Sequence, residues 1–425
     1  MRAPSDKPLP GTEAWEERYS LASPQSLRGL DWFTFFLGDI QTGFGPFIAV
    51  YLATQKWTQT DIGLVLSVGA LASLVSQIPG GWLVDGLRSA RSAAAGAVAA
   101  IGASAFMIAV WPVFLAVASS RALQAAATSV LSPAIAAVSL GLVGRYALAA
   151  RLGRNARFAS AGNGAAALIM GATGHFVSAQ AVFFVTAGFT LPALAALFRI
   201  RDKEVHPASA HGGIASEESS GMVGGLALLL KSRALWVFIV GIVMFQLANA
   251  PMLPLVATEL TKTSSSWAVS LIGACIVLPQ IVVALSAPWV GRLAQRIGRR
   301  PLLVAALAVL PIRGALLAFF SGVFPVVSIQ ILDGVSAAVL GVLIPLVVAD
   351  ISYGTGHFNL AQGVIGMSIG LAAAISTSAA GYIADTYGRH VAFLTLGATG
   401  ALGALLFLLL MPETRPGYDG EDEFA

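Results

Sequence analysis

The sequence predicts an all-α integral membrane protein with 12 transmembrane helices in two pseudo-symmetric six-helix bundles. Three observations support this prediction: the composition, a series of long apolar stretches, and an internal repeat. Of the 425 residues, 56% are apolar and 11% are charged, and the mean hydropathy is +0.79. Because soluble proteins average about 25% charged residues, we expect the lipid bilayer to cover much of the apolar surface.

Twelve apolar stretches have the length of a membrane-spanning helix. An α-helix rises 1.5 Å per residue, so about 20 residues cross the roughly 30 Å hydrocarbon layer. Trp57, Trp111, Trp267 and Tyr387 lie near the ends of such stretches, as is typical at the membrane interface. The predicted spans are 28–53, 61–83, 92–110, 113–141, 158–177, 180–199, 234–257, 268–290, 301–320, 325–350, 361–384 and 390–411.

The basic residues predict the orientation of these spans. Twenty of the 25 Lys and Arg lie in the tails and in the connections on the same side as the tails. Only Lys56, Lys262 and Arg389 lie in the opposite loops. Because cytoplasmic loops are enriched in Lys and Arg, we expect both ends in the cytoplasm of a multi-pass plasma-membrane protein, in the inner membrane if the cell is Gram-negative.

A polar segment divides the chain into halves. Arg201–Met222 is rich in Ser, Gly, Glu and His and has no periodicity, which indicates a flexible linker. The predicted units are a cytoplasmic tail (1–27), a first six-helix bundle (28–199), a cytoplasmic linker (200–233), a second six-helix bundle (234–411) and a cytoplasmic tail (412–425).

The two halves carry matching features, which predicts a duplicated six-helix unit. Each feature is a spacing between two residues that occurs in both halves. The three pairs are Gly81 to Asp85 with Gly291 to Gln295, Arg121 to Pro133 with Asp333 to Pro345, and Gln41 to Pro46 with Gln246 to Pro251.

These motifs resemble those of the major facilitator superfamily over nearly the whole chain. The loop motif of that family, Gly-x-Leu-x-Asp-Arg-x-Gly-Arg-Arg, is matched at Gly291–Arg300, except that Gln295 replaces the acid. After the second span the glycine and the acid are kept as Gly81 and Asp85. The resemblance implies a secondary transporter that works by alternating access, in which the two bundles rock against each other around a central site.

The loop motifs predict a cytoplasmic gate. Asp85 at the end of its helix can accept hydrogen bonds from the free N–H groups at the start of another helix, and the resemblance places that start near Asn359. Such a contact would hold the two halves together. The alternative is a solvated turn that only enforces topology. The predicted gate residues are Gly81, Asp85, Arg88, Gly291, Arg296 and Arg299.

Four charged residues are predicted near the middle of the membrane: Asp39, Arg121, Arg313 and Asp333. Each costs at least ~2.5–3.5 kcal/mol at the centre of a helix unless it is paired or faces water. Their charges sum to zero, and the ninth and tenth spans predict an Arg313–Asp333 ion pair. That pair is either structural or part of the transport cycle.

Polar residues accompany these charges on the same helix faces, and together they predict a substrate cavity. The resemblance implies that the first, fourth, seventh and tenth helices line it. We expect Asp39 or Asp333 to bind and release a proton during transport, because a desolvated carboxylate that loses its partner has a raised pKa. The predicted cavity residues are Thr42, Gln124, Thr128, Gln246, Asn249 and Ser336.

The sequence argues against an enzyme and against a cofactor. It has one cysteine and five scattered histidines, so no metal site is expected, and it contains no P-loop. The string Gly366–Gly370 spells Gly-x-Ser-x-Gly, but it lies in an apolar helix rather than at a strand-to-helix turn. The basic residues are spread along the chain, which argues against nucleic acid. The expected partners are a small-molecule substrate, protons and the lipid bilayer, and we expect a monomer.

Three functions remain compatible with the sequence. The favoured one is export of a small amphiphilic or zwitterionic solute by exchange with protons, although the fifth span lacks the Gly-Pro pair of the family's drug antiporters. The alternative is proton-coupled uptake of a sugar, an organic acid or a chelate. A non-transporting membrane sensor is disfavoured, since no long soluble domain is present.

Overall fold

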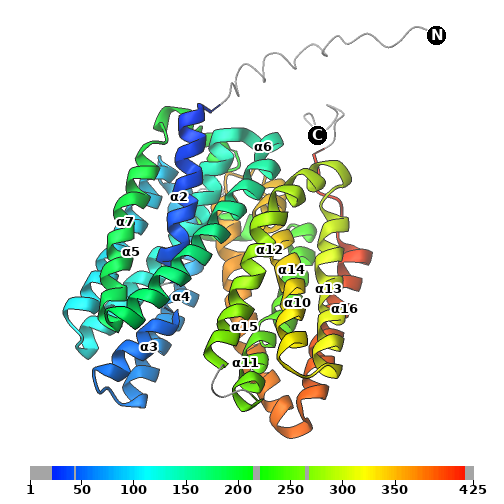
Figure 1. Ribbon diagram of the computed structural model, residues 1–425. Helices are drawn as coiled ribbons and strands as arrows, with labels where there is room; N and C mark the ends of the chain where they lie inside the picture. Colours follow the sequence, from blue (N-terminus) through cyan, green and yellow to red (C-terminus); the bar gives the residue numbers. More distant parts are fainter. Residues whose placement is uncertain (1–21, 43–44, 214–220, 264–267, 417–425) are drawn as a thin grey trace, which may run out of the picture.

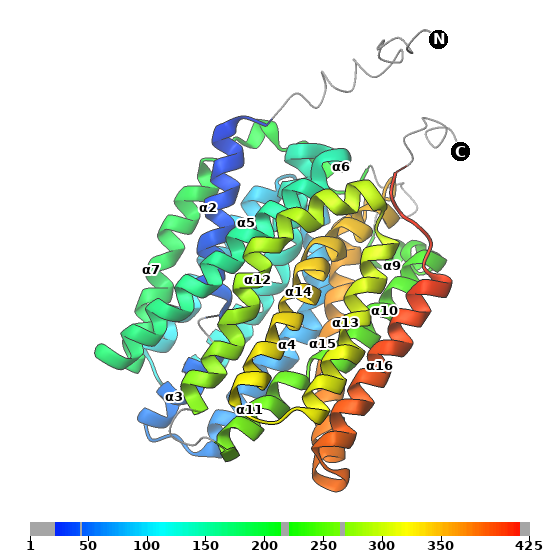
Figure 2. The same ribbon diagram turned by 45° about the vertical axis from the view of Figure 1, so that its right-hand side comes forward.

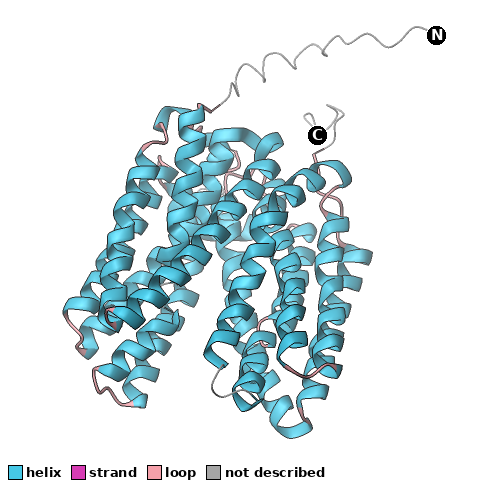
Figure 3. Cartoon of the chain, in the orientation of Figure 1, coloured by secondary structure: helices cyan, strands magenta, loops and turns pink. Residues whose placement is uncertain are grey.

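The computed structural model describes residues 22–42, 45–213, 221–263 and 268–416, and in these ranges all regular structure is helical (Figure 3). Ten of the described helices are long and apolar enough to cross a membrane. The elements are α2 (Pro24–Thr42), α3 (Gly45–Thr54), α4 (Gln59–Gly86), α5 (Ala90–Val110), α6 (Phe114–Phe176), α7 (Ala179–Phe198), η1 (Asp202–Glu204), α8 (Pro207–Ala210), α9 (Met222–Leu229), α10 (Arg233–Asn249), α11 (Met252–Thr263), α12 (Ala268–Ile297), α13 (Arg300–Phe319), α14 (Val323–Ile351), α15 (Phe358–Tyr387) and α16 (Arg389–Leu410).

Residues of the predicted first span form α2 and α3, and residues 43–44 between them lie outside the described ranges. Two departures from the predicted spans have local causes. The predicted seventh span is interrupted before Pro251, which cannot donate a backbone hydrogen bond. The predicted fourth and fifth spans both lie in α6, whose 63 residues form two helical segments that meet at a kink at Gly144. Within α6, Gly144 has φ +68° and ψ 176°, a conformation that favours glycine and that turns the chain between the two predicted spans.

The long helices form two bundles (Figures 1 and 2). Helices α2 to α7 make up one bundle and α10 to α16 the other, and the start of α2 lies at the same end of the molecule as the chain after α16. In Figure 1 the ribbons of the two bundles lie close together at that end and diverge toward the other. We refer to the end that carries the start of α2 as the terminal end.

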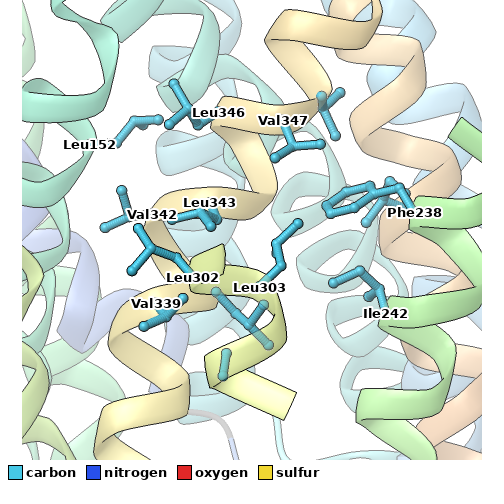
Figure 4. Packing of buried hydrophobic residues seen from close by; sticks show 14 of the residues in the cluster. Leu152, Phe238, Ile242, Leu302, Leu303, Val339, Val342, Leu343, Leu346 and Val347 are labelled. Atoms are coloured by element: carbon cyan, nitrogen blue, oxygen red, sulfur yellow. The ribbon is translucent and has the colours of Figure 1, made fainter. Parts of the chain in front are cut away.

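Apolar packing joins the bundles. The core of the first bundle is built from α2 to α8, with Leu30, Phe33 and Val98 completely buried. A second core takes residues from both bundles: Leu152 of α6 packs in it with Leu346 of α14 and other residues of the second bundle (Figure 4). A third core draws only on residues of the second bundle.

The segment between the bundles is docked where it is described, so the prediction of a flexible linker is wrong for residues 201–213. This part forms η1 and α8 and is held by main-chain hydrogen bonds to both bundles. The N–H of His206 donates to the carbonyl of Gly141 in α6 (3.0 Å), and the N–H of Phe358 donates to the carbonyl of His211 (3.1 Å). Composition alone did not reveal these partners, which belong to distant parts of the chain.

The linker also fastens the start of α2. The Ser23 N–H and hydroxyl donate to Glu204 Oε2 at 2.8 and 2.9 Å, and Arg201 lies 3.4 Å from Oε1. Partial burial opposes ionisation of Glu204, but hydrogen bonds from Ser23 and Ser26 and the charge of Arg201 outweigh it and lower the pKa of the carboxyl.

We predict that Glu204→Gln lowers the free energy of unfolding in detergent by about 1 kcal/mol at neutral pH, because a neutral amide oxygen accepts the hydrogen bonds from Ser23 more weakly than a carboxylate does. The carboxyl of Glu204 has a lower pKa in the folded protein than in the unfolded chain, where it is about 4.3. Its ionised form therefore stabilises the folded state at pH values above about 4.3. The difference between wild type and variant should therefore shrink as the pH falls through the folded-state pKa. Lys203→Gln, at an exposed neighbour, is the control, and a difference independent of pH would contradict this role.

Candidate functional site

Arg313 of α13 is the centre of a buried polar cluster in the second bundle. Its Nη1 donates to Asp333 Oδ1 of α14 and to Asn249 Oδ1 of α10, both at 2.6 Å. Its Nη2 donates to Gln330 Oε1 at 2.7 Å. The Arg313 side chain is 1% exposed and that of Asp333 is 24% exposed. The predicted pair between the ninth and tenth spans is therefore present, and it ties three helices together.

Gln330 is a member of this cluster that was not predicted from the sequence. It lies three residues before Asp333, so both side chains project from the same face of α14. Its Nε2 donates to the carbonyl of Val326 at 3.1 Å, which fixes its Oε1 toward Arg313. The position of a polar residue one helical turn before Asp333 could have indicated from the sequence that Gln330 belongs to the cluster.

Arg121 of α6 is the cation predicted near the middle of the first bundle. Its Nη1 donates to Gln124 Oε1 at 2.5 Å, and the Thr128 hydroxyl donates to the carbonyl of Gln124 at 2.9 Å. The guanidinium lies against Gly69 of α4, where an added Cβ would come within 2.8 Å of it. The predicted neighbours Gln124 and Thr128 thus lie on the same helix face as Arg121.

The other predicted cavity residues differ in their surroundings. Asp39 and Thr42 lie on α2, and their side chains are outside the described residues. Gln246 is half-buried on α10. Ser336 is completely buried, and its hydroxyl donates to the carbonyl of Ala306 in α13 at 2.9 Å. Ser336 therefore belongs to a helix contact rather than to a cavity wall, because the face of α14 that carries it packs on α13.

Asp85 joins the last turn of α4 to the first turn of α15. Its Oδ1 accepts hydrogen bonds from the Asn359 backbone N–H at 3.2 Å and from Asn359 Nδ2 at 2.7 Å. Its Oδ2 accepts from the Leu360 N–H at 2.7 Å. The carboxylate satisfies free donors of a helix that belongs to the other bundle. His211 of the linker lies beside it, with Nδ1 3.6 Å from Oδ1.

Asp350 makes a second connection between the bundles. Its carboxylate, 1% exposed at the end of α14, lies 3.0 Å from Arg299 Nε and 3.6 Å from Arg145 Nε of the first bundle. Arg145 also lies over the ring of Tyr353, with Cζ 4.3 Å from the centroid. Arg299 was predicted from the loop motif, whereas Asp350 and Arg145 were not, because nothing in their spacing indicates that they meet.

Two predicted glycines lie where backbones of different bundles touch. A Cβ added to Gly81 of α4 would come within 2.1 Å of the carbonyl oxygen of Asn359. A Cβ on Gly291 of α12 would come within 2.3 Å of the carbonyl oxygen of Ala149 in α6. Both glycines are therefore needed for this close approach. Next to Gly291, Gln295 Nε2 donates to the carbonyl of Tyr146 at 2.6 Å, so the residue that replaces the acid also links the bundles.

The remaining predicted gate residues are more peripheral. Arg88 is exposed and lines a small pocket with Asp202 of the linker. Arg296 is exposed, and its carbonyl accepts a hydrogen bond from Arg415 Nη1 at 2.9 Å. In the described part of the chain, no group of three or more His, Cys, Asp and Glu side chains is arranged to hold a metal ion.

A further ion-pair cluster inside the first bundle was not predicted. Asp31 of α2, with 3% side-chain exposure, contacts Arg151 at 2.5 Å and Arg154 at 2.6 Å. Arg151 Nε donates to Asn155 Oδ1 at 2.7 Å, and Asn155 Nδ2 donates to the Ser139 hydroxyl at 2.7 Å. The predicted spans leave both arginines in a loop, but they lie on α6, and the buried Arg151 is paired there with Asp31.

Comparison with known proteins identifies the family. The model described as Major Facilitator Superfamily matches residues 32–255 and 242–424. The chain belongs to the Major Facilitator Superfamily. It is a multi-pass membrane transporter and not an enzyme. A related, uncharacterized MFS-type transporter of Mycobacterium tuberculosis is 39% identical over 397 residues, which cover 92% of this chain and 94% of the relative.

Other similar proteins are more distant. The class C tetracycline resistance protein of Escherichia coli is 28% identical over 170 residues, 39% of this chain and 41% of that protein. The E. coli fucose:proton symporter has a TM-score of 0.70 at 16% identity, covering 89% of this chain and 97% of the symporter. A human organic anion transporter has a TM-score of 0.70 at 15% identity, covering 91% and 100%. The two solved structures show a shared fold.

We predict that Arg313→Met destabilises the protein by about 1–3 kcal/mol, because it leaves the buried Gln330 Oε1 without its donor and the partly exposed Asp333 without its cation. The double variant Arg313→Met/Asp333→Leu should regain most of this loss, since both charges are removed. Unfolding in detergent measures the stability of the single and the double variant relative to wild type. A single variant as stable as wild type would contradict the role of Arg313 as the centre of the cluster.

We also predict that Asp85→Asn weakens contact between the bundles, because the amide group cannot accept all the hydrogen bonds that the carboxylate accepts. Val342→Cys, in a Cys275→Ser background, places a thiol in the buried core shared by α6 and α14 (Figure 4). Maleimide labelling of this thiol should become at least tenfold faster with Asp85→Asn, as expected for losing a hydrogen bond to a charged group. Asp61→Asn at the opposite end of α4 should leave the labelling rate unchanged; equal acceleration by both variants would count against a specific role of Asp85.

Proposed function

We propose that this protein moves a small organic solute across the plasma membrane by alternating access, in exchange for protons and in the direction of export. The observation that carries the proposal is the presence of buried charges in both bundles together with polar contacts between the bundles at one end. The contacts would open and close, while the buried charges would move with their own bundle.

The charge pairs support rocking of two rigid units. Arg313 binds Asp333, Gln330 and Asn249, all in the second bundle, and Arg121 binds Gln124 in the first. A rotation of one bundle against the other leaves these hydrogen bonds intact. Asp333, which is partly exposed, and Asp39 are the two candidates for proton binding.

The contacts at the terminal end have the properties of a gate. Asp85 and Asp350 each bind groups of the opposite bundle, and Gly81 and Gly291 allow the backbones to touch there. Separation of the bundles would expose the N–H groups of α15 and the carboxylate of Asp85 to water, which can replace the lost hydrogen bonds. With 20 of the 25 basic residues on this side, we assign the gate to the cytoplasmic face.

Export is favoured over uptake by one relative. The similarity to a tetracycline resistance protein covers 39% of this chain, and resistance is consistent with removal of a compound from the cell. Proton-coupled uptake of a sugar, an organic acid or a chelate is the second candidate function, and it would use the same charged residues. The sign of proton movement during transport distinguishes the two.

The experiment uses proteoliposomes that contain a pH-sensitive dye and are challenged with a panel of amphiphilic and zwitterionic solutes, sugars and organic acids. When a transported solute enters without an imposed pH gradient, exchange should make the lumen more alkaline, whereas symport would make it more acidic. Solute entry with no change in lumenal pH, under conditions in which membrane voltage is dissipated, would overturn proton coupling.

We predict that Asp39→Asn and Arg121→Ala abolish transport driven by a pH gradient while the protein still folds. Asp39→Asn removes a titrating group, and Arg121→Ala removes the cation of the first bundle. Solute exchange at equal pH on both sides, thermal unfolding in detergent and the exposed control Asp61→Asn separate loss of coupling from loss of structure. Full gradient-driven transport by both variants would refute the assignment of these residues to coupling.

A further inference from the structure

We propose that a cavity between α6 and α12 binds the phosphate group of an anionic phospholipid. The cavity has a volume of about 480 Å³ and lies where the two bundles meet. Three arginines and one aromatic ring are among its six lining residues. The lining residues are Ala150, Arg154, Arg157, Phe158, Pro288 and Arg292.

The positive charge of this cavity exceeds what the neighbouring helices neutralise. Neither α6 nor α12 contains an Asp or a Glu. The carboxylate of Asp31 on α2 contacts Arg154, but Arg151 shares the same carboxylate. Arg157 and Arg292 therefore bring two further charges to the cavity. Because a cation within a membrane-spanning segment is costly unless it meets an anion or water, the cavity suits an anionic ligand.

The position of Arg157 follows from the backbone of α12. Pro288 has no N–H, so the carbonyl of Ala284, four residues earlier, lacks its helical donor. Arg157 Nε of α6 donates to this carbonyl at 3.1 Å. The bond fixes the guanidinium across the bundle interface through one nitrogen and leaves the Nη groups to contact a ligand. A phosphate with two or more oxygens matches such a fork.

The other two arginines are held by aromatic rings. Arg292 Cζ lies 5.4 Å from the centroid of Trp289, and Arg154 Cζ lies 5.8 Å from that of Phe158. Each guanidinium is therefore oriented by a cation–π contact. Side-chain exposure of Arg154 is 55%, so it can reach a ligand while it keeps its contact with Asp31.

The surroundings favour a lipid over a soluble anion. On α12, Leu285, Trp289 and Leu293 follow one another at intervals of four residues and are 66%, 70% and 41% exposed, which marks a face directed toward acyl chains. Trp32 of α2, 47% exposed, packs edge-on against Phe158. Exposed tryptophans of this kind are typical of the membrane interface. A lipid could place its headgroup among the arginines and its chains along this face.

The depth of the cavity is consistent with a headgroup. Helix α12 has 30 residues and is therefore about 45 Å long, some 15 Å longer than the hydrocarbon layer. Arg292 lies five residues, or about 8 Å, from the end of α12 at Ile297. It is thus near the boundary between hydrocarbon and headgroups. The proposed cytoplasmic orientation places this boundary in the leaflet where basic sites between helices meet anionic headgroups.

Binding would couple the lipid to bundle closure. The cavity wall combines Arg154 and Arg157 of the first bundle with Arg292 of the second, so a phosphate that contacts both sides would favour the closed terminal end. Lipid binding to this cavity can be tested without measuring transport and without a known substrate.

The test uses the full chain in nanodiscs of phosphatidylcholine with or without phosphatidylglycerol. Native mass spectrometry should detect phosphatidylglycerol retained on the wild-type protein, and the lipid should raise the midpoint of thermal unfolding. Arg157→Gln and Arg292→Gln should each lower the affinity about fivefold, the effect expected for one basic residue at an anionic surface. Arg292 is exposed, so its variant is expected to fold even if Arg157→Gln does not.

Arg233→Gln is the matched control, because Arg233 is an exposed arginine at the start of α10 and does not line the cavity. Equal loss of lipid in this variant and in Arg292→Gln would overturn the site by showing a general charge effect. Inorganic phosphate added to phosphatidylcholine nanodiscs tests a soluble ligand. If phosphate raises the unfolding midpoint as much as phosphatidylglycerol does, and this effect is lost in Arg292→Gln, the assignment to lipid is overturned.

Discussion

The contact between Asp85 and the first turn of α15 is the constraint on which the relation of the two bundles depends. A helix that begins inside a protein in a membrane has N–H groups that need acceptors. Here the acceptors belong to the other bundle, since Asp85 Oδ1 and Oδ2 bind the N–H groups of Asn359 and Leu360. The cap of α15 is therefore complete only when the bundles touch, or when water takes the place of the carboxylate. In the proposed cycle, closure of this end would therefore go together with exclusion of water from it.

Around this contact, the interface combines three kinds of interaction. Asp350 brings Arg299 of its own bundle and Arg145 of the other to one carboxylate. Gly81 and Gly291 remove the side-chain atoms that would keep the backbones apart. Leu152 extends the apolar core of the second bundle into the first (Figure 4). The polar contacts give the interface a defined register, and the apolar contacts contribute burial.

Arg313 and Arg121 differ from the charged residues that join the bundles, because their described hydrogen bonds stay within one bundle. Arg313 has acceptors on α10 and α14, and Arg121 has Gln124 one turn along its own helix. Internal compensation would keep each bundle stable during the proposed movement. The arginines between α6 and α12 are the exception, since Arg157 crosses the interface to a carbonyl that Pro288 leaves without a donor. Because these arginines have no acidic partner on α6 or α12 apart from the shared contact of Arg154 with Asp31 of α2, we propose that an external anion binds between them.

The sequence by itself determined the fold class, the family and which charged residues within apolar spans need a partner. Hydropathy, charge position and repeated spacing are properties of the chain alone. It also predicted the pairing of Arg313 with Asp333, since two charges at equal depth on consecutive spans have few other partners. Only the tertiary structure decided that Asp350 meets Arg145, that Asp31 meets Arg151, that the linker docks at 201–213, and that Ser336 packs against α13. These contacts depend on helix rotation and on which helices are neighbours, and both are determined by packing between segments far apart in the sequence.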